Sequence, residues 1–312
     1  MKKRLVAGID IGGTKCAYGL VDEDGQILCR GQVPTASCES PAELAKIITK
    51  EILKLSHALN GAELIGAGIG APNGNYLTGS VEYAPNLKWK GIIPLASYFK
   101  EAMNCDSLLT NDAKAAAYGE MIFGGAKLMK DFLFITLGTG LGSGIVANGE
   151  MIYGFDGMAG EVGHTIIIPG GRQCGCGRKG CLETYCSATG LSRTYAELQG
   201  KSQEERIPAK EIFELARAEE SFALEAFATT GAWLGFALAN SVAYTRPEAI
   251  FLFGGLAQAK ELLFMPVIES FEKNLLEVYK GKIKILPSRL PGGDAAILGA
   301  ASLVWKNHTS AA

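Results

Sequence analysis

Short apolar runs alternate along this chain with longer segments of helical periodicity. Uninterrupted apolar runs predict buried strands at residues 4–9, 63–72, 132–137 and 249–255. Apolar side chains that recur every three or four positions predict helices over 41–59, 113–123, 209–245 and 294–305. Strands that are apolar on both faces and alternate with helices predict an α/β fold with mostly parallel sheets.

One order of elements occurs twice. Residues 4–33 predict a strand, a Gly12-Gly13 turn, a second strand, an Asp24-Gly25 turn and a third strand. Residues 132–153 repeat this order, with turns at Gly138–Gly140 and at Asn148-Gly149. We interpret the pattern as an internal repeat with one copy in each of two lobes. The 312 residues suit two domains, which we expect at 1–112, completed by the C-terminal helix 294–312, and at 113–293.

The charge balance excludes two classes of partner. Lys and Arg number 30 and Asp and Glu 32, so the net charge of −2 offers no footprint for nucleic acid or an anionic membrane. Asp10 ends the N-terminal apolar run too early for a secretory signal. Asn240 and Ser241 interrupt the richest apolar segment, 231–244, so we expect no membrane span. These features predict a cytoplasmic protein.

The two glycine turns are candidate phosphate sites. The first contains Asp10, Gly12, Gly13, Thr14 and Lys15, and the second contains Gly138, Thr139 and Gly140. Turns without Cβ atoms let backbone N–H groups approach an anion. Neither turn matches GxxxxGK[ST] or GxGxxG, and each alone can be plain structure. As a repeat-related pair they suggest that both grip one polyphosphate, with Asp10 either organising Mg²⁺ or only capping its turn.

A histidine and three cysteines have the composition of a structural zinc site. His164, Cys174, Cys176 and Cys181 supply one imidazole and three thiolates, a closed tetrahedral set. A disulfide is disfavoured in the cytoplasm, and a redox site would favour a CxxC motif, which this segment lacks. The remaining cysteines are Cys186, a spare thiol on the following helix, and the scattered Cys16, Cys29, Cys38 and Cys105.

Carboxylates and an amide suggest the rest of a site. Glu161 and Glu183 flank the zinc segment, where they would bind the hydroxyls of a polyol or remain solvated charges. Asp112 follows Asn111 at the start of a helix, where it is either an N-cap or the carboxylate that accepts a proton from a substrate hydroxyl. Asn111 would bind an adjacent hydroxyl.

Six motifs together resemble the ROK family (repressor, ORF, kinase) of sugar kinases, most closely its glucokinases. They are DIGGTK (10–15), NDAKAAAYGE (111–120), LGTGLGSGI (137–145), ExGH (161–164), CxCGxxGCxE (174–183) and LFGG (252–255). The resemblance covers nearly the whole chain. It implies the two-lobed actin/hexokinase-like (ribonuclease H-like) α/β fold, with a ligand cleft between the lobes.

The resemblance also implies roles for single residues. Asp112 would be the base that activates the 6-hydroxyl of a hexose, and Mg²⁺ and structural Zn²⁺ would be bound. Sugar contacts are expected from Asn86, Asn111, Asp112, Glu161, His164 and Glu183. ATP contacts are expected from both glycine turns and from Gly254 and Gly255. His164 would bind zinc and sugar through its two ring nitrogens. A homodimer is the family's expected assembly.

The resemblance predicts a kinase of the EC 2.7.1 class with glucose as the expected substrate and a place in glycolysis. Kinases for N-acetylglucosamine, N-acetylmannosamine, fructose, mannose or allose share the same motifs and remain alternatives. A sugar-responsive regulator of the family would carry a DNA-binding domain before the first phosphate motif. That motif begins here at residue 10, and both turns and Asp112 are intact, which argues against a regulator.

Overall fold

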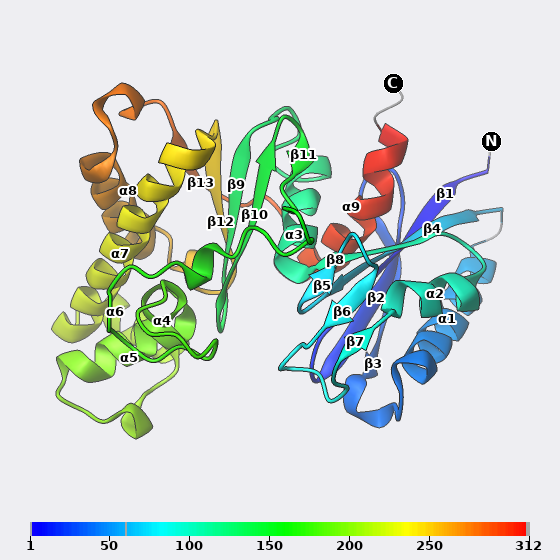
Figure 1. Ribbon diagram of the computed structural model, residues 1–312, viewed down its shortest axis with the longest axis horizontal. Coiled ribbons are helices and arrows are strands. Elements are labelled where there is room, and N and C mark those ends of the chain that lie inside the picture. Colours follow the sequence, from blue (N-terminus) through cyan, green and yellow to red (C-terminus); the bar gives the residue numbers. More distant parts are fainter. Residues whose placement is uncertain (1, 60, 310–312) are drawn as a thin grey trace. The chain divides into compact units, whose positions relative to one another are not determined.

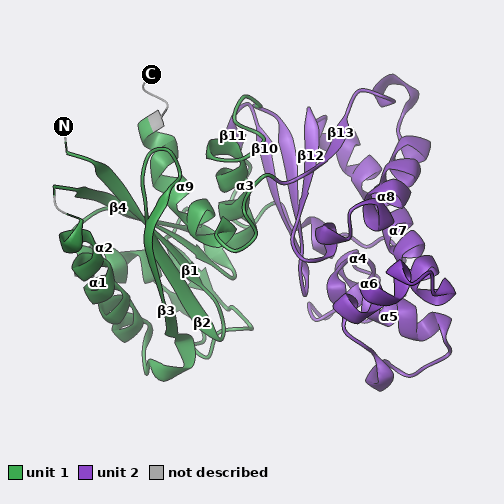
Figure 2. Ribbon diagram, turned by 180° about the vertical axis from the view of Figure 1, so that it is seen from behind, with its two compact units in different colours: residues 1–129, 151–159, 289–312 green, residues 130–150, 160–288 purple. Residues whose placement is uncertain are grey.

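The computed structural model describes residues 2–59 and 61–309, which divide into two compact units (Figures 1 and 2). The first unit comprises Met1–Met129, Met151–Ala159 and Arg289–Ala312, and the second comprises Lys130–Glu150 and Gly160–Ser288. Residues 310–312 of the expected C-terminal helix lie outside the described residues. The α/β class is confirmed, because each unit is a five-stranded sheet with helices packed on it.

The first sheet has the strand order β3-β2-β1-β4-β8. Its strands are β1 (Arg4–Ile11), β2 (Lys15–Val21), β3 (Ile27–Pro34), β4 (Glu63–Ala71) and β8 (Ser107–Asn111). The first three form antiparallel hairpins, whereas β1, β4 and β8 run parallel. The carboxyl ends of the three parallel strands therefore meet at one edge of the sheet.

Helices cover both faces of this sheet. Leu5 and Ile9 of β1 share a core with α1 (Pro41–Ala58) and α2 (Leu95–Met103). The alternate residues of β1 face α9 (Ala295–Thr309), which packs on β1 and β4. Glycine is needed there, because a Cβ atom on Gly8 would lie 2.1 Å from the Ile297 carbonyl oxygen. The glycines of the predicted strands thus admit a helix backbone close to the sheet.

The predicted start of α1 at residue 41 is confirmed. Ser40 is the N-cap, and its side chain accepts a hydrogen bond from the Glu43 N–H at 3.1 Å. Glu43 returns a bond to the N–H of Glu39, one residue earlier than a capping box requires. Pro41 occupies the first helical position, where its missing N–H costs nothing.

A small sheet in the first unit was not anticipated from the pattern. Its strands are β5 (Gly74–Asn75), β6 (Ser80–Glu82) and β7 (Ile92–Ile93). Strands of two or three residues are too short to show a period of two, so no sequence signal distinguishes them from loops. The connection between β6 and β7 carries Asn86, one of the predicted site residues.

The second sheet reproduces the order of the first. Its order is β11-β10-β9-β12-β13, with β9 (Phe132–Leu137), β10 (Leu141–Ala147), β11 (Glu150–Met151), β12 (Ala249–Phe253) and β13 (Lys284–Pro287). The β9–β10 pair is antiparallel, and β9, β12 and β13 run parallel. This correspondence confirms the internal repeat. The Asn148-Gly149 turn has positive φ at both residues, as a tight hairpin of this sequence requires.

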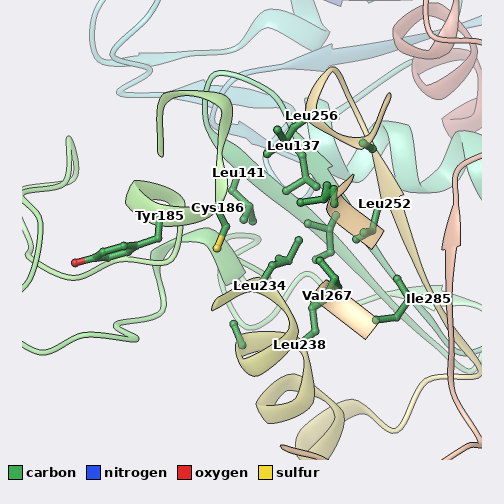
Figure 3. Close-up of a cluster of buried hydrophobic side chains, with 14 of the residues drawn as sticks. Leu137, Leu141, Tyr185, Cys186, Leu234, Leu238, Leu252, Leu256, Val267 and Ile285 are labelled. Carbon is green, nitrogen blue, oxygen red and sulfur yellow. The ribbon is translucent and has the colours of Figure 1, made fainter. Parts of the chain in front are cut away.

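Five helices complete the second unit. They are α4 (Glu183–Cys186), α5 (Ala188–Leu198), α6 (Ala209–Arg217), α7 (Ser221–Thr245) and α8 (Glu261–Asn274). The predicted helical region 209–245 is thus two helices. Figure 3 shows Leu137 and Leu141 with Leu234 and Leu238 of α7 in the buried core. Cys186, the spare thiol, also lies in this core.

Helix α7 is the one described helix that is long and apolar enough to cross a membrane by length and composition. Of its most apolar window, 56% is buried within the protein, where α7 packs against α5 and α8. Asn240 and Ser241, which interrupt the apolar run in the sequence, lie inside α7 and do not end the helix. The Ser241 hydroxyl donates to the Ala237 carbonyl at 3.0 Å, which satisfies it inside the helix. A buried core helix meets the same test, so the finding is weak evidence for a span.

The compact units divide the chain differently from the sequence-based domains. The helix α3 (Asp112–Ile122) belongs to the first unit, whereas the boundary was expected directly after residue 112. Helix α3 packs closely on α9, and a Cβ atom on Gly119 would lie 3.0 Å from the Gly299 Cα.

The short 3₁₀ segments among the described residues are η1 (Thr35–Ser37), η2 (Val162–His164), η3 (Gln203–Glu205), η4 (Leu256–Ala259) and η5 (Glu277–Tyr279).

Candidate functional site

Two carboxylates of the first unit lie at the edge where its parallel strands end. Asp10 of β1 is in register with Gly70 of β4, and Gly70 is in register with Thr110 of β8, two residues before Asp112. A Cβ atom on Gly70 would lie 3.8 Å from Asp10 Oδ1 and 3.7 Å from the Asp112 Cα. The acids therefore flank Gly70 at the carboxyl ends of the strands, where α/β folds bind ligands.

The pKa values of both acids are raised, and the charge of Asp112 contributes to the rise at Asp10. Burial raises the pKa of Asp10 from 3.8 to about 6, the negative charge of Asp112 adds to that rise, and Lys15 opposes it. Asp112 is an exposed residue, but the surrounding protein desolvates its carboxyl group, and this desolvation is the largest cause that raises its pKa, against the hydrogen bonds from the Ala113 N–H and the Asn111 side chain. A pair of facing carboxylates with raised pKa values is suited to bind a divalent cation or to accept a proton.

Asn111 and Asp112 have different roles at the start of α3. Asn111 is the N-cap, and its Oδ1 accepts hydrogen bonds from the N–H groups of Ala113 at 2.9 Å and Lys114 at 3.4 Å. The alternative that Asp112 is only the N-cap is therefore wrong. Asp112 is the first helical residue, and its Oδ1 accepts the Ala113 N–H at 2.8 Å.

Thr35 and the backbone of Asn86 both contact the first glycine turn. The Thr35 hydroxyl donates to the Gly12 carbonyl at 2.6 Å, and the Thr35 N–H donates to the Thr14 carbonyl at 3.0 Å. Gly13 lies against the backbone of Asn86, because a Cβ atom on Gly13 would be 2.4 Å from the Asn86 carbonyl oxygen. Within the first unit, the structure thus places Asn86 at the Gly12–Lys15 turn.

Sequence reasoning missed a buried lysine beside Asp112. Lys114 is almost fully buried, and its Nζ donates to the Gly157 carbonyl at 3.2 Å and lies 5.6 Å from the centre of the Tyr153 ring. Tyr153 in turn stacks on Tyr76, with ring centres 4.5 Å apart. These contacts attach residues 151–159 to α3 and to Tyr76 in the first unit. A lysine among the alanines of AKAAAYGE was the available signal.

The second glycine turn borders a cavity in the second unit. A cavity of about 500 Å³ is lined by Gly138 and Thr139, by Gly255 after β12, and by Lys210 and Phe213 of α6, among others. Gly254 has a φ of +106°, and a Cβ atom there would lie 2.5 Å from the Leu137 carbonyl oxygen, so only glycine fits. The volume suits a ligand of the size of a nucleoside. The α6 residues were missed because their helix is far along the chain from both turns.

The histidine and cysteine ligands converge in the second unit. One donor atom each from His164, Cys174, Cys176 and Cys181 lies within 4.8 Å of every other. The Cys176 and Cys181 sulfurs are 3.6 Å apart, and Cys174 Sγ is 3.7 Å from His164 Nδ1. A tetrahedral site with Zn–S bonds of about 2.3 Å places neighbouring sulfurs about 3.8 Å apart. The donor set and its spacing therefore fit zinc, and the cysteines are free thiols rather than disulfides.

The thiols of this cluster differ in acidity. The backbone N–H of Arg178 lowers the pKa of Cys176 to about 6, whereas burial raises the pKa of Cys174 to about 12. One thiolate is thus already favoured near neutral pH, and a bound cation would favour the others.

Arg172 attaches the same loop to the helices behind it. Its guanidinium forms an ion pair with Glu197 and donates to the Thr184 carbonyl at 2.7 Å and to the Thr194 hydroxyl at 3.0 Å. It also lies 4.4 Å from the centre of the Tyr185 ring. The loop between His164 and Glu183 is therefore anchored to α4 and α5 independently of its metal ligands.

The predicted sugar contacts fall into two sets, one in each unit. Glu161 is exposed directly before η2, which ends at His164. Glu183 begins α4, and its Oε2 accepts the Leu141 N–H at 3.0 Å, next to the second glycine turn. Asn86, Asn111 and Asp112 lie in the first unit.

Comparison with known proteins identifies one family across the chain. A family model described as the ROK family matches residues 6–307. A glucokinase of Halalkalibacterium halodurans is 35% identical, over 99% of this chain and 98% of its own length. The crystal structure of a ROK family glucokinase from Streptomyces griseus in complex with glucose and AMPPNP is 33% identical, with a TM-score of 0.76 over 96% of this chain and 98% of that one. That of a ROK hexokinase from Thermus thermophilus is 29% identical, with a TM-score of 0.85 over 98% and 99%.

Relatives with other names are matched at lower identity. An N-acetylmannosamine kinase of Escherichia coli is 30% identical over 95% of this chain and 96% of its own length. A xylose repressor of Bacillus subtilis is 29% identical over 95% of this chain and 76% of its own length.

Proposed function

This chain belongs to the ROK family, and from that premise we propose that it is an ATP-dependent kinase that phosphorylates the 6-hydroxyl of a hexose. The observation that carries the proposal is the pair of acids on either side of Gly70. Phosphoryl transfer to an alcohol needs one carboxylate to accept the hydroxyl proton and a cation to neutralise the phosphates. Asp112 and Asp10 supply suitable groups at the ligand-binding edge of one sheet.

The proposed roles follow from the position of each group. Asp112 accepts the proton of the 6-hydroxyl, because its side chain is open to solvent and Asn111 has taken the N-cap position. Asp10 holds Mg²⁺ directly or through water, which relieves its repulsion from Asp112. The phosphates of ATP bind the two glycine turns, and the nucleoside binds the cavity beside Gly255.

Zinc is proposed as a structural ion. Its four protein ligands leave no open position for a substrate, so the ion would hold the loop between His164 and Glu183 in place. His164 faces the cysteines with Nδ1, which leaves Nε2 for a sugar hydroxyl. Glu161 and Glu183 at the two ends of the loop would accept further hydroxyls.

Glucose is the proposed substrate, because the relatives matched at the higher identities are named glucokinases. N-acetylmannosamine, N-acetylglucosamine, fructose, mannose and allose are the alternative sugars, and the match to an N-acetylmannosamine kinase fits the first of these. A sugar-responsive regulator fits less well, because a regulator has no use for Asp112 together with two intact phosphate turns. We also propose that the protein is a homodimer, that it is cytoplasmic and that it acts in glycolysis. We propose no nucleic-acid or membrane partner.

The deciding experiment measures ADP release from Mg-ATP with glucose, fructose, mannose, allose, N-acetylglucosamine and N-acetylmannosamine. Glucose should have the highest kcat/KM by about tenfold, or about 1.4 kcal/mol of transition-state discrimination. If another sugar has the highest kcat/KM, the proposed substrate changes and the proposed kinase activity stands. No turnover with any sugar would contradict the kinase.

Asp112→Asn is the matched control for that experiment. The amide keeps the size and hydrogen-bonding reach of the carboxylate but cannot accept the proton, so turnover should fall by about two to four orders of magnitude. Sugar affinity, measured by titration calorimetry, should stay near the wild-type value. Near-normal turnover in this variant would remove Asp112 from its role as base.

A further inference from the structure

The carboxylate of Glu183 is attached to the second glycine turn. Its Oε2 accepts the Leu141 N–H at 3.0 Å, across 42 positions of sequence, and its Oε1 lies 3.7 Å from Cys174 Sγ. One carboxylate thus connects the proposed phosphate turn with a proposed zinc ligand, and all three groups lie within the second unit.

Gly140 provides the room for this attachment. A Cβ atom on Gly140 would lie 2.4 Å from Glu183 Oε2, far inside van der Waals contact. The atom in conflict is the end of a flexible side chain, so a Cβ atom would displace the carboxylate rather than the backbone. Gly138, two residues earlier in the same turn, differs, because a Cβ atom there would meet nothing within 4 Å.

Two further bonds attach the segment after Glu183 to the same turn. The Ala188 N–H donates to the Gly138 carbonyl at 2.8 Å, and the Thr189 hydroxyl donates to the Thr139 carbonyl at 2.9 Å. Gly138, Thr139 and Leu141 of the turn are therefore each hydrogen-bonded to a residue between 183 and 189, and the Gly140 carbonyl accepts the Gly138 N–H at 3.0 Å. Glu183 is thus bonded directly to the turn and is also linked to it through the segment that follows.

We propose that Gly140 is a positioning residue for the sugar, although it lies in the phosphate turn. By leaving space for the Glu183 carboxylate, it fixes the hydrogen bond to the Leu141 N–H and with it the oxygen that Glu183 presents to a sugar hydroxyl. This inference rests on the proposed function, since it takes Glu183 to be a sugar contact. It adds that the phosphate turn and the sugar-binding carboxylate form one bonded structure.

The arrangement predicts coupling between the two substrates. A nucleotide that moves the Leu141 N–H also moves the donor to which the Glu183 carboxylate is bonded. A sugar that binds Glu183 in turn moves the acceptor of the Leu141 N–H. Because coupling free energies are reciprocal, each ligand must change the affinity of the other by the same factor.

The test compares Gly140→Ala with Gly138→Ala by glucose titration calorimetry without nucleotide. Gly140→Ala should weaken sugar binding about tenfold or more, because a bond to an ionised carboxylate is lost or misdirected. Gly138→Ala should change the sugar Kd by less than about twofold, and any effect it has should fall on ATP. Equal sugar Kd values for the two variants would overturn the inference. Absence of sugar binding by the wild-type protein, across the sugar panel, would overturn the proposed function and this inference with it.

A measurement on the wild-type protein covers the case in which Gly140→Ala does not fold. With ¹⁵N-labelled leucine, the amide resonance of Leu141 should move when glucose is added without nucleotide, because its acceptor Glu183 then binds the sugar. A Leu141 resonance that stays in place at saturating glucose would overturn the inference. Zinc content and melting temperature of both glycine variants establish whether each is folded.

Discussion

Asp10 is held in the first unit at a cost in stability. Its pKa of about 6 in the folded protein exceeds the ordinary value of 3.8, so folding favours the protonated carboxyl. Such a group contributes its full stability below the unfolded pKa, and that contribution is lost as the pH rises through the folded pKa. At neutral pH the ionised Asp10 therefore destabilises the protein, as expected for a side chain kept for function.

Asp10→Asn should stabilise the metal-free protein at pH 7 by about 1–3 kcal/mol, because the amide resembles the protonated carboxyl. The difference from the wild type should shrink as the pH falls below 6 and vanish near pH 4. Urea denaturation at several pH values without Mg²⁺ measures it, and kcat/KM for Mg-ATP should fall in the same variant. A variant that is less stable than the wild type at pH 7 would contradict the assigned burial and repulsion.

At this scale, sequence reasoning succeeded where a residue type and its neighbours determine the chemistry. The set His164, Cys174, Cys176 and Cys181 was predicted from composition and spacing, and these residues do converge. Contacts between distant residues were not predictable. Nothing in the sequence indicates that Glu183 reaches Leu141 or that Lys114 reaches Gly157, because these pairs meet only through the fold.

The loop between His164 and Glu183 carries three of the proposed sugar contacts at or next to its ends, Glu161, His164 and Glu183. It has little regular structure and only two isolated β-bridges, Ile166 to Cys181 and Gln173 to Lys179. Besides backbone hydrogen bonds within it, such as that from the Cys174 N–H to the Arg178 carbonyl at 2.9 Å, the loop is attached through the proposed zinc cluster and through Arg172. These two attachments are separable by mutation.

Cys176→Ser should remove zinc and loosen the loop. Cys176 is the exposed thiol of the cluster, so the substitution leaves no buried cavity and acts through the metal alone. Metal analysis should give a large loss of zinc, and hydrogen exchange should become faster between residues 164 and 183. Unchanged zinc content would contradict the assigned ligand set.

Arg172→Met should loosen the loop while zinc stays bound. The substitution removes the ion pair with Glu197 and the bonds to Thr184 and Thr194, at a cost of about 1–3 kcal/mol in the free energy of unfolding. Limited proteolysis and hydrogen exchange should report the loosened loop. Because Arg172 bonds the residue after Glu183, the sugar KM should rise more than the ATP KM.

Arg193→Met is the matched control for the Arg172 variant. Arg193 makes a single bond to this loop, from its Nη1 to the Gln173 carbonyl at 3.0 Å, at an exposed position. Its loss should cost less than about 1 kcal/mol. Equal effects of the two substitutions would show that Arg172 has no special role in anchoring the loop.

Elements with a clear period or a terminal signal were predictable, and the others were not. The strands β1, β2, β3, β4, β9, β10 and β12 and the helices α1, α3, α6, α7 and α9 follow from apolar patterns and turn residues. The two-residue strands β5 and β7 and the four-residue helix α4 are too short to carry a period. They are formed by contacts with the rest of their unit.

The whole molecule contains two copies of one repeated unit, and each copy has its own core. The buried clusters around β1 with α1 and around β9 with α7 share no residue. The repeat was visible in the sequence because its turns carry glycine at corresponding places. The extent of the two units was not visible in the sequence, because the chain passes from one unit to the other several times. Residues 151–159, for example, belong to the first unit through contacts such as that of Lys114 with Gly157.

Separate cores predict separate responses to perturbation. The proposed zinc ligands lie wholly within the second unit, and Asp10 and Asp112 lie wholly within the first. Differential scanning calorimetry should therefore resolve two transitions, since units with their own cores unfold as separate cooperative units. A zinc chelator should lower the melting temperature of one transition by several degrees, because bound metal stabilises only the structure that holds it. Asp10→Asn should raise the other at neutral pH. A single transition that both changes move equally would show that the two units unfold together, and that the stability of the zinc loop is shared by the whole chain.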